Sequence, residues 1–411
     1  MDLTKRRWII LVACCLINLC LGSIYAWSVF AGGMADYLTA TTGTTLTTAD
    51  LAIVYTIANA VGPITMISGG WFNDRFGPRM VILVGGVMFG LGMIASGFVT
   101  SVGGLILTYG IISGLGLGMA YGCTISTCMK FFPDRRGLIG GVTTAVYGMS
   151  SVILPPVVTA IVAATDATVA FKAIGAAFVV IIGVCSLFVS QCPDGFVPEG
   201  WEPPAQTGDA PAARNLDWRQ MIATPVFWCM LLMLTCGAFA GMMIISQASA
   251  IAQNMVGMEP MAASLAVSVL ALFNALGRIA AGTISDRIGR IGTLTGACAL
   301  SLVGLGLLFV TGQGSVITFY GGIAVVGMCF GAFMGVFPGF TSDQFGPKNN
   351  SVNYGIMFIG FALAGYLGPT VMRSIYASTG AYGKAFLVAC GLDVAGIVLS
   401  MLYRAAAKRE A

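Results

Sequence analysis

The chain has 411 residues, of which 9% are charged and 57% are hydrophobic, and it contains no histidine. Soluble domains carry roughly 25% charged residues, so this chain lacks the polar surface that a soluble protein of its length needs. Without histidine it has no His-ligated metal, His proton shuttle or His-activated nucleophile. The composition predicts an integral membrane protein that is not a hydrolase, and we expect no enzyme activity, metal or cofactor.

Twelve apolar stretches follow one another along the chain, each near the roughly 20 residues that a bilayer-spanning helix needs. They lie at residues 8–33, 49–71, 80–99, 103–130, 137–164, 168–190, 224–252, 260–284, 291–311, 315–338, 350–372 and 383–403. The first resembles a secretory signal peptide, but its apolar run is long and eleven more follow, so we expect it to be retained. The predicted fold class is an all-α integral membrane protein with twelve transmembrane helices.

Basic residues orient these predicted helices. With the N-terminus inside, the outer segments hold only Lys172, Arg373 and Lys384. The inner segments hold Lys5, Arg6, Arg7, Arg75, Arg79, Lys130, Arg135, Arg136, Arg214, Arg219, Arg287, Arg290, Lys348, Arg404, Lys408 and Arg409. This positive-inside bias predicts a multi-pass protein of the cell (inner or plasma) membrane with both termini in the cytoplasm. The net charge of +4 reflects the bias, so we expect the lipid bilayer and no nucleic acid as a partner.

One long polar segment, residues 191–223, divides the chain. It is rich in proline and charge, which is typical of an irregular linker. We therefore predict an N-terminal six-helix bundle at 1–190, a cytoplasmic linker at 191–223 and a C-terminal six-helix bundle at 224–411.

The two halves repeat each other at an offset of 212 residues. At this offset the run Gly70-Trp-Phe-Asn-Asp74-Arg75-Phe-Gly77 falls on Gly282-Thr-Ile-Ser-Asp286-Arg287-Ile-Gly289. Further glycines and a lysine match at the same offset, which indicates duplication. Parallel six-helix repeats with a substrate path at their interface are a common transporter plan.

The doubled run resembles the loop motif between helices 2 and 3, and between helices 8 and 9, of the major facilitator superfamily. The resemblance covers essentially the whole chain and implies two pseudo-symmetric six-helix bundles. It also implies a gating role for Asp74, Arg75, Asp286 and Arg287, in a cytoplasmic latch that holds the outward-open state. The alternative is a short loop whose charges only set topology.

Arg278 stands inside an apolar span, where an arginine costs roughly 2.5–3.5 kcal/mol on insertion scales and is functional by default. Asn274 lies four residues earlier, on the same helical face. A guanidinium can hold a carboxylate through two hydrogen bonds, and a nearby amide can add a third. The alternative is an arginine that binds interhelical carbonyls or an acid.

Two further segments resemble the oxalate–formate antiporter and monocarboxylate porter branch of the superfamily. They are Gly118-Met-Ala-Tyr121-Gly-Cys-Thr-Ile-Ser-Thr-Cys-Met-Lys130-Phe-Phe-Pro-Asp-Arg-Arg136-Gly and Phe337-Pro-Gly-Phe-Thr-Ser-Asp343-Gln-Phe-Gly. The resemblance implies that Arg278 anchors the substrate and that Tyr121 lines the cavity. The oxalate exchanger has a second basic residue where this chain has Phe361, and one cation among phenyl rings suits a small monocarboxylate. The proton-relay residues of animal monocarboxylate transporters are missing here, one of them being replaced by Asn274.

Four aromatic residues fall in helices 1, 4, 10 and 11, which line the cavity in this superfamily. They are Tyr25, Tyr121, Phe333 and Phe361, and we expect them to contact substrate, the alternative being packing. Asp393 is a mid-span carboxylate of helix 12, so it is either a buried hydrogen-bonding group or a proton site.

These residues predict a secondary active transporter, since no ATP-binding phosphate loop is present. We expect proton-coupled symport of a small, lactate- or pyruvate-like monocarboxylate by a monomer that works by alternating access. Exchange of one carboxylate for another, as in oxalate–formate antiport, is the alternative. A sensor or membrane enzyme is a third class, but the spans offer no recognisable catalytic group.

Overall fold

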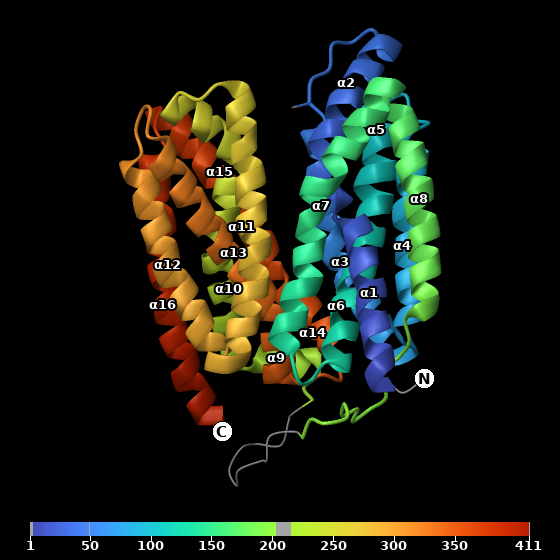
Figure 1. Cartoon of the computed structure of the whole chain (residues 1–411), viewed down its shortest axis with the longest axis vertical. Coiled ribbons are helices and arrows are strands. Elements are labelled where there is room, and N and C mark those ends of the chain that lie inside the picture. Colours follow the sequence, from blue (N-terminus) through green and yellow to red (C-terminus); the bar gives the residue numbers. More distant parts are fainter. Residues whose placement is uncertain (1–2, 49, 203–214, 411) are drawn as a thin grey trace. The chain divides into compact units, whose positions relative to one another are not determined.

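The computed structural model describes residues 3–48, 50–202 and 215–410 and is helical throughout its spans. Within these residues, twelve helical stretches are long and apolar enough to cross a membrane, which confirms the predicted fold class (Figure 1). The first part of the chain forms α1 (Leu3–Leu21), η1 (Gly22–Ala26), α2 (Trp27–Thr42), α3 (Ala52–Phe76), α4 (Pro78–Ser96), α5 (Val102–Leu105), η2 (Ile106–Ser113), α6 (Gly114–Phe131), α7 (Arg136–Ala164) and α8 (Ala167–Phe188). The remainder forms α9 (Trp218–Ala223), α10 (Pro225–Ile251), η3 (Ala252–Val256), α11 (Pro260–Ile288), α12 (Arg290–Val310), α13 (Val316–Phe345), α14 (Asn350–Met357), α15 (Ile359–Thr379) and α16 (Gly383–Glu410).

Contacts divide the chain into two units. The first unit comprises Met1–Phe132, Val146–Trp201 and Lys348–Ile356, and the second comprises Pro133–Ala145, Glu202–Pro347 and Met357–Ala411. Each unit therefore contains one short segment from the other half of the sequence: the start of α7 in the second unit, and α14 up to Ile356 in the first. The bundle boundaries at 190 and 224 stay a prediction about the two sequence halves.

The first unit is built on close contacts between glycine-rich helices. α6 packs against α3 and α4, and α4 packs against α8. A Cβ atom added at Gly114 or Gly118 would collide with backbone carbonyls of α3, at Ala58 and Gly62 respectively. Gly114 and Gly118 thus form a packing surface of α6 that lets two helix backbones approach directly.

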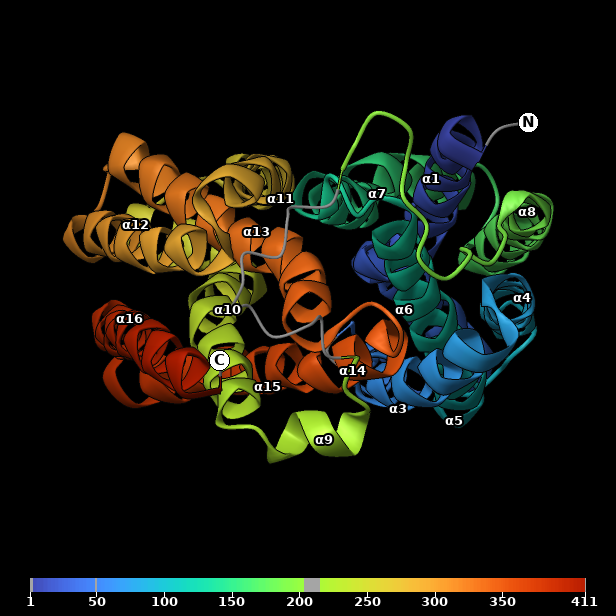
Figure 2. The ribbon, with the colours of Figure 1, turned by 90° about the horizontal axis from the view of Figure 1, so that it is seen from below.

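The second unit has α13 near its centre, between α10, α11 and α12, while α16 packs against α10 and α12 (Figure 2). Gly237 and Gly241 of α10 leave room for two phenyl rings of α13, because a Cβ atom at either glycine would collide with the ring of Phe333 or Phe330. This tight packing fixes the height of α13 relative to its neighbours, which matters for the site below.

The C-terminal end of the linker is helical, whereas the sequence predicts an irregular segment throughout 191–223. Residues 203–214 of it lie outside the described residues, and residues 218–223 form α9. The Asp217 side chain accepts a hydrogen bond from the Gln220 backbone, and the Gln220 side chain accepts one from the Asp217 backbone. This reciprocal capping box stabilises the short helix α9. The proline and charge content of the segment does not predict this helix.

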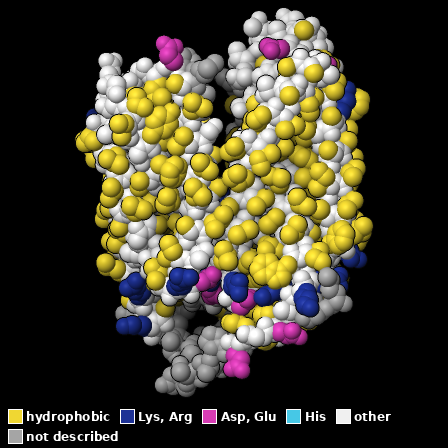
Figure 3. All heavy atoms as spheres, in the orientation of Figure 1, with side chains coloured by type: hydrophobic (Ala, Val, Ile, Leu, Met, Phe, Trp, Pro, Cys, Tyr) yellow, Lys and Arg dark blue, Asp and Glu magenta, His cyan; other side chains and the backbone are white. Residues whose placement is uncertain are grey.

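The outer surface of each unit is apolar along most of its length, and Lys and Arg side chains gather towards the lower end of each unit on the face shown in Figure 3. Exposed side chains such as Val180, Val303 and Ile317 are 63%, 56% and 88% accessible. Apolar flanks with charges at one end are what a bundle in lipid requires.

Candidate functional site

In the first unit, Asp74 connects three segments at the end of α3. The chain turns from α3 into α4 at Gly77, whose φ of 88° is open to glycine but strained for other residues. The Asp74 Oδ1 atom accepts hydrogen bonds from the Lys130 Nζ at 2.7 Å and the Ser351 Oγ at 2.8 Å. Its Oδ2 atom accepts the Val352 N–H of α14 at 3.3 Å. The carboxylate therefore holds the first turn of α14 next to α3.

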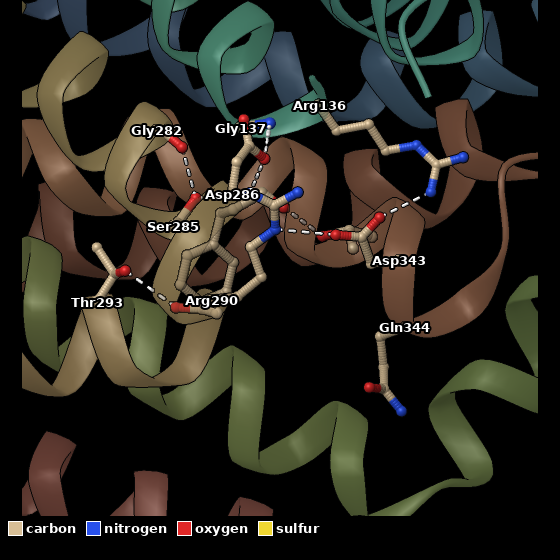
Figure 4. A network of polar contacts seen from close by, with 12 residues as sticks. Arg136, Gly137, Gly282, Ser285, Asp286, Arg290, Thr293, Asp343 and Gln344 are labelled. Carbon is tan, nitrogen blue, oxygen red and sulfur yellow. Dashed lines mark hydrogen bonds and ion pairs between the residues drawn. The ribbon is translucent and has the colours of Figure 1, made fainter. Parts of the chain in front are cut away.

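In the second unit, Asp286 plays the corresponding part at the end of α11 (Figure 4). Its Oδ1 and Oδ2 atoms accept the backbone N–H groups of Gly137 at 2.8 Å and Leu138 at 2.9 Å. These are two of the otherwise unpaired N–H groups at the start of α7, where a negative charge is favoured. Asp286 thus caps a helix that is remote from it in sequence.

A chain of charges extends from Asp286 through the second unit. Arg290 donates to the Asp286 Oδ1 atom at 2.6 Å and to the Asp343 Oδ2 atom at 2.8 Å. Asp343 in turn accepts from the Arg136 Nη1 atom at 2.7 Å. Figure 4 shows Arg290 between the two carboxylates. The network ties α7, α11, α12 and α13 together at one end of the unit.

The arginines of the two predicted gating motifs, Arg75 and Arg287, take no part in the ion pairs described above. The Arg75 guanidinium lies over the Trp71 ring at 5.3 Å and is exposed, and Arg287 is also exposed. Among the ion pairs formed by the described residues, none includes either arginine. Their predicted gating role stays a prediction, whereas Lys130, Ser351, Arg290 and Asp343, which the sequence reading did not assign to a site, supply the contacts.

Arg278 is buried inside the second unit, with only 3% of its surface exposed. Its Nε atom donates to the Asn274 Oδ1 atom at 2.8 Å, and its Nη1 atom donates to the Thr144 carbonyl at 2.5 Å. No carboxylate among the described residues forms an ion pair with it, and none of their hydrogen bonds uses its Nη2 atom. The guanidinium is thus oriented by neutral acceptors and keeps donors for a further acceptor.

Three glycines fix the backbone that carries Arg278. A Cβ atom at Gly335 of α13 or at Gly141 of α7 would collide with the Arg278 carbonyl, and one at Gly331 would collide with the Asn274 carbonyl. α11 is therefore in backbone contact with α13 and with the start of α7. A shift of α13 along its own axis must displace the anchor pair.

The predicted aromatic contacts of this unit lie in ring clusters. Phe333 is fully buried against Gly237 and stacks on Phe337 at 6.1 Å. Phe361 is half-buried and stacks on Phe358 at 4.5 Å, at the break between α14 and α15. These contacts show packing; substrate contact by Phe333 and Phe361 stays a prediction.

The other two predicted aromatics lie in the first unit and share a partner. The Tyr147 ring lies 4.4 Å from the ring of Tyr121 and 5.3 Å from that of Tyr25. Tyr25 belongs to η1, the tight turn of helix that interrupts the first span. The sequence does not single out Tyr147, because it lies in α7, the fifth span, which is not among the spans expected to line a cavity.

Asp393 is completely buried in α16, and neither of its carboxyl oxygens has a hydrogen-bond partner among the described residues. The Ser301 hydroxyl of α12 faces it without reaching hydrogen-bond geometry. The two alternatives for Asp393, a buried hydrogen-bonding group and a proton site, both stay predictions.

Comparison with known proteins identifies the group to which this architecture belongs. The family model described as Major Facilitator Superfamily matches residues 16–369. The chain belongs to the Major Facilitator Superfamily. This confirms the resemblance carried by the doubled motif, and because members of the superfamily are transporters, the chain is a multi-pass membrane transporter rather than an enzyme.

Relatives and solved structures agree with this assignment. An uncharacterized MFS-type transporter, YhjX, of Escherichia coli strain K12 is 28% identical over 87% of this chain and 86% of its own length. The oxalate:formate antiporter of Oxalobacter formigenes is 27% identical over 94% and 88%, and monocarboxylate transporter 12 of Xenopus laevis is 24% identical over 93% and 85%. The proton:xylose symporter XylE shares the fold with a TM-score of 0.72 at 14% identity, covering 97% of this chain and 95% of its own.

Proposed function

We propose that this superfamily member transports small monocarboxylates of the lactate or pyruvate kind across the cell membrane, coupled to a proton, by alternating access. The observation that carries the proposal is Arg278, a buried guanidinium without an anionic partner among the described residues. An uncompensated cation at this depth is costly, and a bound carboxylate would compensate it. Two of the relatives are named for monocarboxylate or oxalate and formate transport, which supports this class of substrate.

Arg278 would hold the carboxylate through the N–H groups that Asn274 and Thr144 leave unused. Asn274 orients the guanidinium and, in a second role, would offer its amide to the hydroxyl or carbonyl of the substrate. Tyr25, Tyr121, Phe333 and Phe361 would contribute apolar contacts along the path. Phe361 in place of a second cation favours a monocarboxylate over a dicarboxylate.

Electrostatics supports the coupling of transport to a second ion. Bringing a monoanion into a cell with a negative interior costs about 2.3 kcal/mol per 100 mV. A proton that moves with the anion cancels this cost, as does an anion that leaves in exchange. Carboxylate exchange is therefore the second candidate, favoured by the relative named as an oxalate:formate antiporter.

We also propose that both termini lie on the cytoplasmic side, that the protein works as a monomer, and that Asp74 and Asp286 act in the gate. In the state described here these two carboxylates hold the first turns of α14 and α7. Arg75 and Arg287 belong to the same motifs and would join the gate only in another state.

Uptake of labelled lactate into proteoliposomes tests the function. Uptake that rises with an inward acid gradient indicates symport, and uptake that requires internal carboxylate indicates exchange. Protein-free vesicles correct for passive entry of the neutral acid. Failure to move any monocarboxylate of two to four carbons in either assay would overturn the substrate class.

Arg278→Gln tests the anchor. Removing one partner of a buried charge pair costs about 2 kcal/mol or more, so carboxylate binding should weaken by at least about 30-fold. Arg373→Gln is the matched control, because Arg373 is exposed and donates only to the Pro369 carbonyl of its own helix among the described contacts. Wild-type affinity in a folded Arg278→Gln protein would exclude the anchor role.

A further inference from the structure

The buried carboxyl of Asp393 has no evident structural task. It lies ten residues into α16, about 15 Å of helix from Gly383, so it is far from either end of the span. Its exposed fraction is zero, and within the part of the chain that the structure describes both oxygens lack hydrogen-bond partners. A carboxyl that served only to join helices would bond to a neighbour, since an unpaired buried polar group costs free energy and stabilises nothing.

The groups that lie within electrostatic reach of Asp393 come from α10, α12, α13 and α16 itself, and none of those among the described residues is basic. Thiols of α10, α12, α13 and α16 lie within electrostatic reach, at Cys236, Cys298, Cys329 and Cys390. The Ser301 hydroxyl of α12 faces the carboxyl as well. No Lys or Arg among the described residues forms an ion pair with Asp393, and an unpaired buried charge is costly.

Helix α13 has one residue close to Asp393 and others in contact with Arg278, the proposed substrate anchor. Cys329 of α13 lies near Asp393, while Gly331, two residues further on, lies against the Asn274 carbonyl and the Arg278 backbone. Gly335 touches Arg278 one turn later. Helix α13 thus carries a thiol within electrostatic reach of Asp393 and, on another face, two glycines in contact with the backbone around Arg278.

We propose that Asp393 is the proton-binding group of the transport cycle, and that α13 couples its protonation to carboxylate binding at Arg278. The proposal rests on the proposed function. The O–H bond of Asp393 forms with a proton taken from water on one side of the membrane and breaks to release that proton to water on the other. One proton accompanies one monoanion, so no net charge crosses. Because the acid is closed off in the state described here, proton exchange requires the state in which α13 has moved.

Asp393→Asn separates coupling from transport. The amide mimics the neutral acid, so lactate counterflow without a pH gradient should persist to within about twofold of wild type. Uptake driven by an inward acid gradient should fall to the rate measured without a gradient. For wild type, one coupled proton and a pH difference of one unit correspond to about tenfold accumulation. Asp36→Asn is the matched control, since it removes one exposed carboxylate and should leave both assays unchanged.

Two more variants guard against a folding defect. Asp393→Glu keeps an ionisable acid and should restore gradient-driven uptake. Ser301→Ala removes the facing hydroxyl and should shift the pH at which gradient-driven uptake is half-maximal. Gradient-driven uptake that survives in Asp393→Asn would overturn the proposal, as would a Ser301→Ala profile identical to wild type. Loss of counterflow in folded Asp393→Asn that Asp393→Glu does not restore would overturn it too, by indicating a structural role. Absence of both activities in the wild type would instead overturn the proposed function.

Discussion

The two copies of the repeated motif use the same aspartate in different ways. In the second unit, Asp286 accepts two backbone N–H groups of α7 at 2.8 and 2.9 Å. In the first unit, Asp74 reaches α14 mainly through the Ser351 hydroxyl, and its single backbone contact with Val352 is longer at 3.3 Å. One copy is a direct helix cap, and the other is an ion pair to which a helix start is attached.

The cations differ as well. Lys130 is the basic partner of Asp74, and its other hydrogen bond within the described segments is to the Lys348 carbonyl at 3.3 Å. Arg290 is shared between Asp286 and Asp343, and Asp343 also binds Arg136. The planar guanidinium can bridge two carboxylates where an ammonium cannot match both geometries. We infer that the latch of the second unit is the stiffer one, and that sequence duplication preserved the carboxylate while the partners diverged.

The largest expected effect comes from Asp286→Asn. It weakens two charge-assisted bonds to the start of α7 and the bond to Arg290, and hydrogen bonds to charged groups contribute about 1.5–3 kcal/mol each. We expect a loss of about 3 kcal/mol in the stability of the second unit, because the contributions are not additive. Hydrogen exchange should accelerate in the peptide that contains Gly137 and Leu138 and should stay unchanged in α16. Equal protection in mutant and wild type would show that the cap is dispensable.

Asp74→Asn should have a smaller effect with a different character. Its main consequence is an unpaired Lys130, so we expect a loss of about 2 kcal/mol that the additional change Lys130→Met reverses to within about 1 kcal/mol, because removing both charges spares the cost of an isolated one. Adding Arg290→Met to Asp286→Asn should give no such recovery, since α7 remains uncapped and Asp343 loses a partner. The measurement is the melting temperature of the two single variants and the two double variants. The same degree of recovery in both units would remove the distinction between cap and ion pair.

Much of the fold could be predicted from composition and spacing, because a bilayer imposes one length and one chemistry on every span. The twelve spans and the superfamily follow from this constraint and from the doubled motif. The interruption of the first span at η1 could not be predicted, because Gly22–Ala26 contains no proline and no charge that would break a helix. Tight helical turns there depend on packing, such as the contact of Gly22 with the Tyr147 carbonyl.

Site residues could be predicted where a charged side chain stands in an apolar span, because its burial is costly. They could not be predicted where the contact uses a group that many residues possess. Arg278 and Asp393 stand out in apolar sequence, and the structure finds both buried. Thr144 acts through its carbonyl, which every residue possesses, so no sequence signal could single it out. Asp343 and Arg290 looked like end-of-helix charges. The repeat does hold a usable signal for Ser351, because an offset of 212 places it on Ile139, beside the capped start of α7.

Substitution of Arg75 or Arg287 should have the smallest effect on stability. Both arginines belong to the repeated motif, where a latch of ion pairs would use them. Both are exposed, and Arg75 lies on Trp71 rather than on a carboxylate. Exposed substitutions away from special features change stability by about 0.5 kcal/mol at most. Arg75→Gln and Arg287→Gln should therefore leave the melting temperature and the hydrogen exchange of α7 and α14 near wild type, while the aspartate variants do not. If either arginine variant instead loosened the helix start beside it as much as the neighbouring aspartate variant, the latch would depend on the arginine in this state, and the carboxylate would be one partner of it rather than its centre.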